Sequence, residues 1–387
     1  MIWLVAGSLI PSMAVAWTAA WAVRRFGPRL GLVDKPGHRK VHSTAMPTSG
    51  GLAIWLGIVG PLAAGQVAVW LLYAAGFGVR HAGPPDGSLA GLVALHLGGL
   101  IQQSGKLWTI LAGGTVLTLL GLLDDRFGLS WKLRLGVETA VALTLVALGW
   151  RMSLFIDAPW LTGALSVVWI VGLINSFNML DNMDGLSAGV AAIAAAILAV
   201  VMLTVRNPAT NQPQLFVGGL LLVIVGSLLG FLGHNRPPAR LFMGDAGSYL
   251  IGYLLAMMTL TGTFAWANLP KHAILAPLCA LAVPLYDTLT VVVIRLRSGR
   301  SPFVGDRNHF SHRLVELGMT KGQAVLTIYL ATATCGLGAL LLHEVDALGA
   351  AVILALVACT LVLVAILETA GRRRRSDKNE GDADGTR

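Results

Sequence analysis

The chain has 387 residues, of which 55% are hydrophobic and only 12% are charged, and its mean hydropathy is +0.73. A soluble domain carries roughly 25% charged residues, so this composition excludes a soluble globular enzyme, a disordered chain and a disulfide-rich scaffold. Forty-six glycines agree with a membrane protein, because small residues let membrane helices approach one another closely. The expected fold class is therefore all-α, a polytopic helical membrane protein.

Basic residues outnumber acidic ones, with 28 Lys and Arg against 19 Asp and Glu, which gives a net charge of +9 at pH 7. In a membrane protein such an excess gathers in the cytoplasmic loops. The charge therefore indicates membrane topology, and no nucleic-acid partner is expected.

Apolar segments recur along the whole chain. A helix needs about 20 apolar residues to cross a bilayer, and eleven segments, some of them short, are predicted as transmembrane helices. They lie at about 1–22, 49–75, 107–123, 132–150, 163–179, 185–204, 215–233, 247–264, 271–294, 322–342 and 346–369.

The basic residues orient these predicted helices in the membrane. Arg24 and Arg25 follow the first segment, which predicts a cytoplasmic first loop and an N-terminus on the outer side. With alternating loops, 23 of the 28 basic residues fall on the cytoplasmic side, and the C-terminus lies there too. Residues 1–370 then form one integral-membrane catalytic domain, and residues 371–387 form a basic, polar cytoplasmic tail that is predicted to be disordered.

One apolar segment, residues 87–101, is too short for a confident transmembrane assignment. If it crossed the membrane, the first basic loop and the loop at Asp124 would face opposite sides. We therefore predict a re-entrant or interfacial helix on the outer side.

Polar side chains gather at the predicted cytoplasmic ends of the helices. A transporter places ionisable residues near mid-membrane along its path, whereas of the candidate site residues only Asp287 lies clearly within a predicted helix. This one-sided arrangement suits an enzyme that works at the membrane surface. The residues concerned are Asp124, Asp125, Asn175, Asn178, Asp181, Asp184, Asn235, Arg240, Asp245, Ser248, Asp306, His309 and His312.

The residue types indicate phosphoryl transfer. Carboxylates and amide oxygens suit Mg²⁺, a hard cation that is often shared with substrate phosphates. Basic side chains can hold phosphate oxygens, and metal and positive groups together neutralise the charge of the transition state. We expect one substrate to be a phosphorylated lipid and the other a soluble diphosphate. The basic residues near the acids are Arg39, Lys40, Arg126, Arg240, Arg307 and Arg313.

Each motif also has a purely structural interpretation. The asparagines and aspartates of residues 175–184 could join helices by hydrogen bonds, and Asp245 or Ser248 could cap a helix. Asp287 could be a structural acid or part of the site. His309 and His312 are too few for a closed zinc site, so contact with phosphate or acid–base chemistry is the expected role.

Taken together and in this order, these segments resemble the polyprenyl-phosphate N-acetylhexosamine-1-phosphate transferases of glycosyltransferase family 4, which include WecA-type and MraY-type enzymes. The resemblance covers about Asp34 to Arg313. The segments that carry it are DKPGHRKVHSTAMPTSGG, GLLDD, NSFNMLDNMDGLSAG, FLGHNRPPARLFMGDAGS, PLYD and DRNHFSHRL.

This resemblance implies transfer of a sugar 1-phosphate, with N-acetylglucosamine as the expected sugar, from a UDP-N-acetylhexosamine to undecaprenyl phosphate, with release of UMP. It implies Mg²⁺ as the cofactor, with Mn²⁺ as a substitute, and a site on the cytoplasmic side of the inner membrane. The product would initiate a lipid-linked glycan of the cell envelope, such as lipopolysaccharide or a cell-wall polymer. A homodimer is compatible with the sequence.

The resemblance also implies roles for single residues. Asp124 and Asp125 match the paired catalytic aspartates, and Asp124 is expected to orient or deprotonate the lipid phosphate. Asp245, with Asp125 and Asn178, is expected to hold the metal. The expected substrate-binding residues are Arg39, Lys40, Asn175, Asn178, Asp181, Asp184, Arg240, His309, His312 and Arg313.

Two features separate the branches of the family. MraY-type enzymes, which use a UDP-muramoyl pentapeptide, carry consecutive histidines where this chain reads HFSH, with Ser311 in place of a histidine. The D-x-P-x-x-R-K-x-H pattern from Asp34 to His42 also favours the WecA-type branch. The MraY-type reaction is the alternative within the family, and an ion-coupled transporter is the alternative outside it. The sequence leaves open whether transfer takes one step or uses an aspartyl intermediate.

Overall fold

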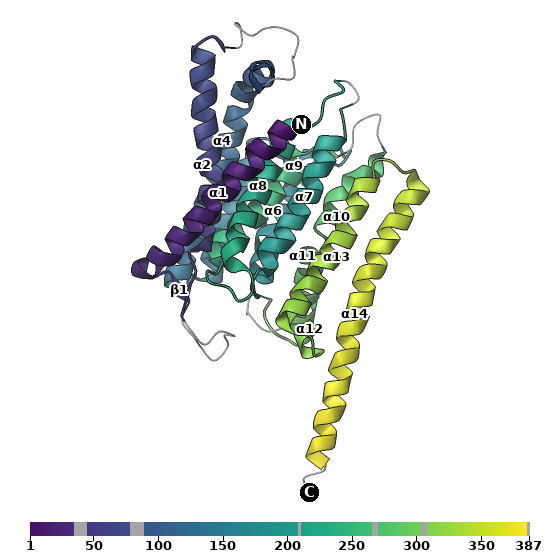
Figure 1. The fold of residues 1–387 in the computed structure, drawn as a ribbon. Helices are drawn as coiled ribbons and strands as arrows, with labels where there is room; N and C mark the ends of the chain where they lie inside the picture. The colour runs from purple at the N-terminus through teal and green to yellow at the C-terminus, as the bar shows by residue number, and fades with distance from the viewer. Residues whose placement is uncertain (35–44, 78–88, 208–209, 265–269, 303–307, 385–387) are drawn as a thin grey trace.

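The computed structural model of the 387-residue chain describes all residues except 35–44, 78–88, 208–209, 265–269, 303–307 and 385–387. The described part of the chain is a bundle of helices, and its only sheet there is a two-stranded antiparallel pair (Figure 1). The fold class predicted from composition, an all-α helical membrane protein, is confirmed at this level.

The N-terminal part supplies two long helices joined by the small sheet. Phe242 donates its backbone N–H to the carbonyl of Pro47, and Gly50 and Gly51 donate theirs to the carbonyls of Phe242 and Met243. The start of the second long helix is therefore bonded to a segment almost 200 residues later in the chain. The elements are α1 (Ile2–Phe26), η1 (Gly27–Leu30), β1 (Val33–Asp34), β2 (Met46–Pro47) and α2 (Gly50–Ala74).

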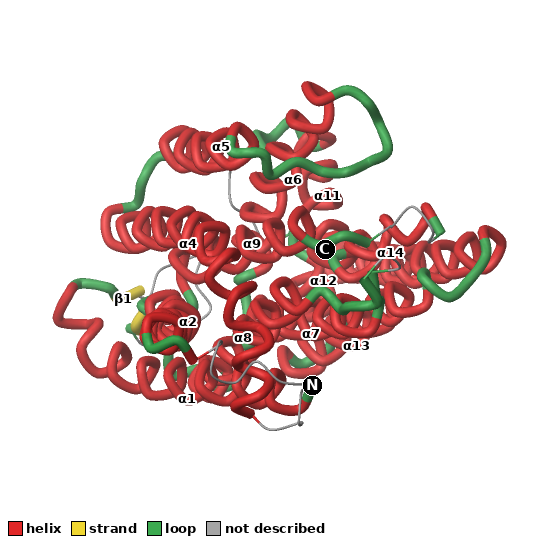
Figure 2. The backbone as a smooth tube through the Cα atoms, turned by 90° about the horizontal axis from the view of Figure 1, so that it is seen from above, coloured by secondary structure: helices red, strands yellow, loops and turns green. Residues whose placement is uncertain are grey.

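The rest of the bundle follows in chain order. Seen from above, α7, α8 and α9 lie in the middle, while α5 lies at one edge and α13 near the opposite one (Figure 2). The bounds are α4 (Leu89–Phe127), α5 (Trp131–Ala147), α6 (Pro159–Leu180), α7 (Leu186–Thr204), α8 (Leu215–Asn235), α9 (Gly244–Thr261), η2 (Lys271–Leu275), α10 (Ala276–Ala280), α11 (Ala282–Arg297), α12 (Phe310–Glu316), α13 (Lys321–Leu341) and α14 (Ala347–Asp384).

All eleven predicted segments are helical, but fewer qualify as membrane spans. Within the described residues, eight helices are long and apolar enough to cross a membrane, and a ninth span arises if the two helices on either side of Leu281, bent by 68°, are taken together. Neither α5 nor α9 is among them, since α5 has only 17 residues, three of them charged, and α9 begins with a polar turn at Asp245. The chain is thus a multi-pass membrane protein, and eleven crossings stay a prediction.

Residues 89–101 are helical, as predicted, but they do not form a separate re-entrant helix, and an interfacial position stays a prediction. Residues 89–101 are the first part of α4, a single helix of 39 residues that ends at Phe127. The polar stretch 102–106, which lies between two of the apolar segments, is helical as well. At 1.5 Å per residue the 39 residues of α4 measure about 58 Å along the helix axis, more than the roughly 30 Å of hydrocarbon in a bilayer.

The two chain ends lie at opposite ends of the bundle (Figure 1), as expected for termini on opposite sides of a membrane. Which side is cytoplasmic stays a prediction. The last helix, α14, extends past the bundle and continues to Asp384, into the segment predicted as a polar tail. Disorder of that tail also stays a prediction.

The start of α9 packs directly against the end of α4. Gly121 of α4 faces the first turn of α9, and a Cβ atom there would lie 2.2 Å from the backbone nitrogen of Ala246. Since real atoms do not approach so closely, only glycine allows the two helices to touch at this level. This contact fixes where the first residues of α9 sit relative to α4.

We predict that Gly121→Ala lowers the stability of the protein in detergent by about 1–3 kcal/mol, because the new methyl group pushes α9 from α4. The measurement is thermal unfolding. Gly105→Ala is the matched control, since it lies on the same helix with open space around it. A Gly121→Ala protein as stable as the control would contradict this packing.

Candidate functional site

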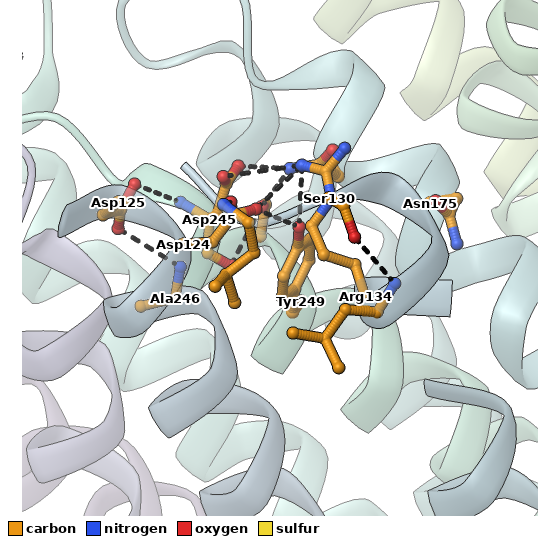
Figure 3. Close-up of polar contacts among 12 residues, drawn as sticks. Asp124, Asp125, Ser130, Arg134, Asn175, Asp245, Ala246 and Tyr249 are labelled. Atoms are coloured by element: carbon orange, nitrogen blue, oxygen red, sulfur yellow. Dashed lines mark hydrogen bonds and ion pairs between the residues drawn. The ribbon is translucent and has the colours of Figure 1, made fainter. Parts of the chain in front are cut away.

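Polar residues from four segments meet at one end of the bundle. These segments are the end of α4, the start of α5, the turn after α6 and the start of α9 (Figure 3). The chain leaves α4 through Gly128, whose φ of +66° turns it toward α5, and enters α9 through Gly244, whose φ is +71°. These two turns bring residues separated by more than 100 positions into contact.

Asp124 is buried, and both of its carboxylate oxygens accept hydrogen bonds. Its Oδ2 atom accepts hydrogen bonds from Arg134 Nη1 at 2.8 Å and from the hydroxyl of Tyr249 at 2.9 Å. Its Oδ1 atom accepts one from the backbone N–H of Leu129 at 2.7 Å. The Arg134 guanidinium balances the buried negative charge, which would otherwise be costly. Asp124 is therefore fixed in position on both of its oxygens.

Asp125 caps a helix to which it does not belong. Its Oδ1 atom accepts from the backbone N–H of Asp245 at 3.0 Å and its Oδ2 atom from that of Ala246 at 3.5 Å, both in the first turn of α9 (Figure 3). The first N–H groups of a helix lack partners within the helix. A Cβ atom on Gly244 would lie 2.4 Å from Asp125 Oδ2, so glycine is required there for space as well as for its backbone angle.

This arrangement settles the capping question raised by the sequence. The structural interpretation of MGDAGS assigned the cap of α9 to Asp245 or Ser248. In the structure the carboxylate at the start of α9 comes from Asp125, and Asp245 occupies the first turn with its own side chain turned to other partners.

Asp245 lies between α6 and α5. Asn178 donates from Nδ2 to Asp245 Oδ1 at 2.6 Å and to Ser248 Oγ at 3.1 Å. Asp245 Oδ2 lies 4.0 Å from Arg134 Nη1. About a third of the Asp245 side chain is exposed, which leaves it accessible from the open end of the bundle.

Asp181 and Asp184 add further negative charge beside Asp245. Burial raises the pKa of Asp181 to about 8, and repulsion by Asp245 and Asp184 acts in the same direction, while the backbone N–H of Gly244 opposes it. Asp184 accepts from the backbone N–H of Ala239 at 2.9 Å and so holds the loop before α9. Burial and the neighbouring acids thus disfavour the negative charge of Asp181, and a cation bound beside it would favour the ionised carboxylate.

A second polar group surrounds the start of α12. Asp287 Oδ2 lies 3.0 Å from His309 Nδ1, and Asp287 Oδ1 accepts from the backbone N–H of Phe310 at 2.6 Å. The ring of His312 lies 6.4 Å from that of His309, centre to centre. Asp287, which the sequence left open, thus orients His309 and caps α12.

Ser311 connects this second group to the first. Its hydroxyl donates to Oδ1 of Asn182, a residue of the turn between Asp181 and Asp184. Ser311 therefore joins the histidine-bearing segment to the aspartate-bearing turn.

Two predicted substrate-binding residues pair with glutamates rather than with the aspartates of the site, and a third is exposed. Arg313 is buried, where its Nη2 atom lies 3.2 Å from Glu368 Oε2 of α14 and 3.1 Å from Thr290 Oγ1 of α11. Asn175 donates to Glu138 of α5 at 2.5 Å, which fits the interhelical bonding considered for its segment. Arg240 is exposed to solvent. Arg39 and Lys40, like Asp306 and Arg307, lie outside the described residues.

The sequence prediction missed Arg134, Glu138, Asn182 and Tyr249. Charged residues within an apolar helix are unusual and tend to be functional. Arg134 and Glu138 could therefore have been predicted from their charge within the apolar segment 132–150. Asn182 lies within a quoted motif and could have been named with it. Nothing in the sequence marks Tyr249 as a partner of Asp124.

The donor set fits a magnesium ion. Among the described residues no three His, Cys, Asp or Glu side chains are grouped as a closed metal site. Mg²⁺ commonly binds through one or two protein carboxylates and completes its shell with water and substrate phosphates. Asp245, with the Asn178 amide beside it and Asp181 nearby, would supply one such carboxylate.

Comparisons with known proteins agree on one family. Residues 107–263 match the sequence model of glycosyl transferase family 4, a range that runs from α4 through α9 and contains Asp124, Asp125, Asp181, Asp184 and Asp245. A Bacillus subtilis protein, the "probable undecaprenyl-phosphate N-acetylglucosaminyl 1-phosphate transferase", is 31% identical over 317 residues, which cover 80% of this chain and 76% of that protein.

Two further relatives carry similar names. The Escherichia coli K12 "undecaprenyl-phosphate alpha-N-acetylglucosaminyl 1-phosphate transferase" is 30% identical over 80% of this chain and 76% of its own length. The "decaprenyl-phosphate N-acetylglucosaminephosphotransferase" of Mycobacterium tuberculosis H37Rv is 30% identical over 84% of this chain and 79% of its own length. The similarity thus extends over most of each protein.

We predict that Asp125→Ala lowers the free energy of unfolding by about 1–2 kcal/mol, because two N–H groups of α9 lose their acceptor. Asp125→Asn keeps one side-chain acceptor, so its free energy of unfolding should fall by less than that of Asp125→Ala. Thermal unfolding of both variants in detergent measures the difference. Equal stability of Asp125→Ala and wild type would show that the two hydrogen bonds from α9 to Asp125 do not stabilise the fold.

Proposed function

Because the chain belongs to glycosyl transferase family 4, the polyprenyl-phosphate sugar-1-phosphate transferases, we propose that it transfers N-acetylglucosamine 1-phosphate from UDP-N-acetylglucosamine to undecaprenyl phosphate and releases UMP. The observation that carries the proposal is the convergence of Asp124, Asp125 and Asp245 at one open end of the bundle, inside the segment that matches the family.

The choice of substrates follows the relatives. All three are named for N-acetylglucosamine, two for undecaprenyl phosphate and one for decaprenyl phosphate. These names favour the WecA-type reaction over the MraY-type reaction with a muramoyl pentapeptide, in agreement with the HFSH segment.

In the proposed reaction an oxygen of the lipid phosphate attacks the phosphorus that bears the sugar, and the bond from that phosphorus to UMP breaks. Asp124 and Arg134 form an ion pair beside Asp245. Arg134 has 29% of its side chain exposed against 4% for Asp124, so its guanidinium would be available to the substrate phosphates while Asp124 holds it in place. Asp124 acts here by orienting the lipid phosphate.

Magnesium is the proposed cofactor, with manganese as a substitute. Asp245, Asp125 and Asn178 would hold it, since a carboxylate that accepts hydrogen bonds still has lone pairs for a metal. Bound Mg²⁺ would neutralise negative charge on the diphosphate oxygens. Asp125 additionally keeps the first turn of α9 in place, and Asn178 keeps the Asp245 carboxylate oriented.

The remaining polar residues are assigned to the sugar nucleotide. Asp181 and Asp184 line the turn next to Asp245, and His309 and His312 lie beyond it, joined through Ser311. Arg39, Lys40 and Arg240 are assigned to substrate phosphates on the basis of their charge. Asn175 and Arg313, given their contacts with Glu138 and Glu368, are assigned a supporting role.

The membrane position is also a proposal. With the predicted alternation of loops, 23 of the 28 basic residues lie on the same side as the site, which supports an inner (plasma) membrane protein whose site faces the cytoplasm, where nucleotide sugars are available. The lipid-linked product would start an envelope glycan, such as lipopolysaccharide or a cell-wall polymer.

The test is release of UMP by the purified protein in detergent with undecaprenyl phosphate, Mg²⁺ and a panel of UDP-sugars. We expect UMP and a lipid-linked product with UDP-N-acetylglucosamine. Product formed only from UDP-muramoyl pentapeptide would support the MraY-type reaction instead. Solute accumulation in proteoliposomes without UMP release would support a transporter.

We predict that Asp245→Asn lowers turnover by about a hundredfold or more, because the substitution removes the central carboxylate of the metal site. The measurement is UMP release at saturating substrates over a range of Mg²⁺ concentrations. Asp157→Asn, an exposed aspartate in the loop between α5 and α6, is the matched control and should behave as wild type. Wild-type turnover by Asp245→Asn would refute the metal assignment.

A further inference from the structure

Tyr249 is a buried tyrosine of α9 whose hydroxyl meets the pair formed by Asp124 and Arg134 (Figure 3). The hydroxyl donates to Asp124 Oδ2 at 2.9 Å and accepts from Arg134 Nη1 at 3.3 Å, while the same Nη1 donates to Asp124 Oδ2 at 2.8 Å. The three groups therefore form a closed triangle of hydrogen bonds.

The two donors to Asp124 Oδ2 differ in how firmly they are held. The Arg134 side chain is long and 29% exposed, and a phosphate would compete for it. Tyr249 is only 1% exposed, and its ring belongs to the core between helices. A packed tyrosine has few rotatable bonds, so its hydroxyl is the fixed point of the triangle.

The opposite oxygen of Asp124 is fixed by the backbone of the next turn. Leu129 donates its N–H to Asp124 Oδ1 at 2.7 Å, just before α5 begins at Trp131. The carboxylate plane is thus set by one backbone donor and one phenol. If the phenol were lost, the carboxylate could rotate about its remaining contacts and Arg134 would lose one acceptor.

We propose that Tyr249 is a positioning residue: its hydroxyl fixes the orientation of Asp124 and, through it, of Arg134 toward the phosphates. This inference rests on the proposed function for its effect on turnover, but its effect on Asp124 does not depend on any substrate. Tyr249 does not touch the reacting atoms.

The same helix offers a matched control. Tyr253 lies one turn later on α9, is fully buried, and donates its hydroxyl at 2.9 Å to α4, to the carbonyl of Ile110. Tyr249→Phe and Tyr253→Phe therefore each remove one buried hydroxyl that faces α4. Only the first substitution affects the carboxylate.

The first measurement is steady-state UMP release. Tyr249→Phe should lower kcat by about tenfold, as expected for a lost hydrogen bond to a charged group that matters in the transition state. Its KM for UDP-N-acetylglucosamine should stay within about twofold of wild type. Tyr253→Phe should have the kcat and KM of wild type. The two variants should unfold at similar temperatures.

The second measurement needs no activity. Hydrogen exchange of the full-length protein in detergent reports on the backbone N–H of Leu129, which donates a hydrogen bond to Asp124 Oδ1. Exchange in the peptide that contains Leu129 should become about threefold faster or more in Tyr249→Phe and stay unchanged in Tyr253→Phe.

Unchanged exchange in Tyr249→Phe would overturn the positioning role, whatever happens to turnover. Faster exchange with wild-type kcat would overturn its importance for the reaction. If the wild-type protein released no UMP from any UDP-N-acetylhexosamine, the proposed function would fail, and the exchange measurement would still decide whether Tyr249 holds Asp124.

Discussion

The organisation of the site depends on the first turn of α9. Its unpaired N–H groups are accepted by Asp125 of α4, and the backbone just before it is bonded to the start of α2. Gly121 lets α4 approach closely enough for this cap to form. Once the turn is held, Asp245 projects from it toward α6 and α5. The first N–H groups of a helix have no partner within the helix, so an acceptor from another segment stabilises its start.

Around this turn the described part of the chain brings several acidic side chains close together. Arg134 neutralises Asp124, whereas Asp181 is repelled by Asp245 and Asp184, which helps to raise its pKa to about 8. A metal and the diphosphate of a nucleotide sugar supply complementary charges, and this supports phosphoryl transfer as the use of the cluster. Structural stability would favour fewer acids, so their retention points to function.

Much of the fold and of the site was predictable, for identifiable reasons. Apolar length alone located the helices, since a bilayer demands about 20 apolar residues, and acids at helix ends located the cluster. Hydropathy could not show that residues 89–127 form one helix, because it treats a polar stretch as a break. The partners of Asn175 and Arg313 depend on how neighbouring helices are rotated, which no local pattern records. The role of Tyr249 could not be predicted for the same reason, because its contact with Asp124 depends on how α9 packs against α4.

The most direct test of the account is to locate a bound metal and nucleotide sugar. We would determine a structure of the protein with Mn²⁺ and UDP-N-acetylglucosamine and identify the metal by its anomalous scattering. The account predicts an anomalous peak within coordination distance of the Asp245 carboxylate, with the diphosphate between it and Arg134. A peak or nucleotide elsewhere, such as beside Arg313 and Glu368 or at the opposite end of the bundle, would contradict it.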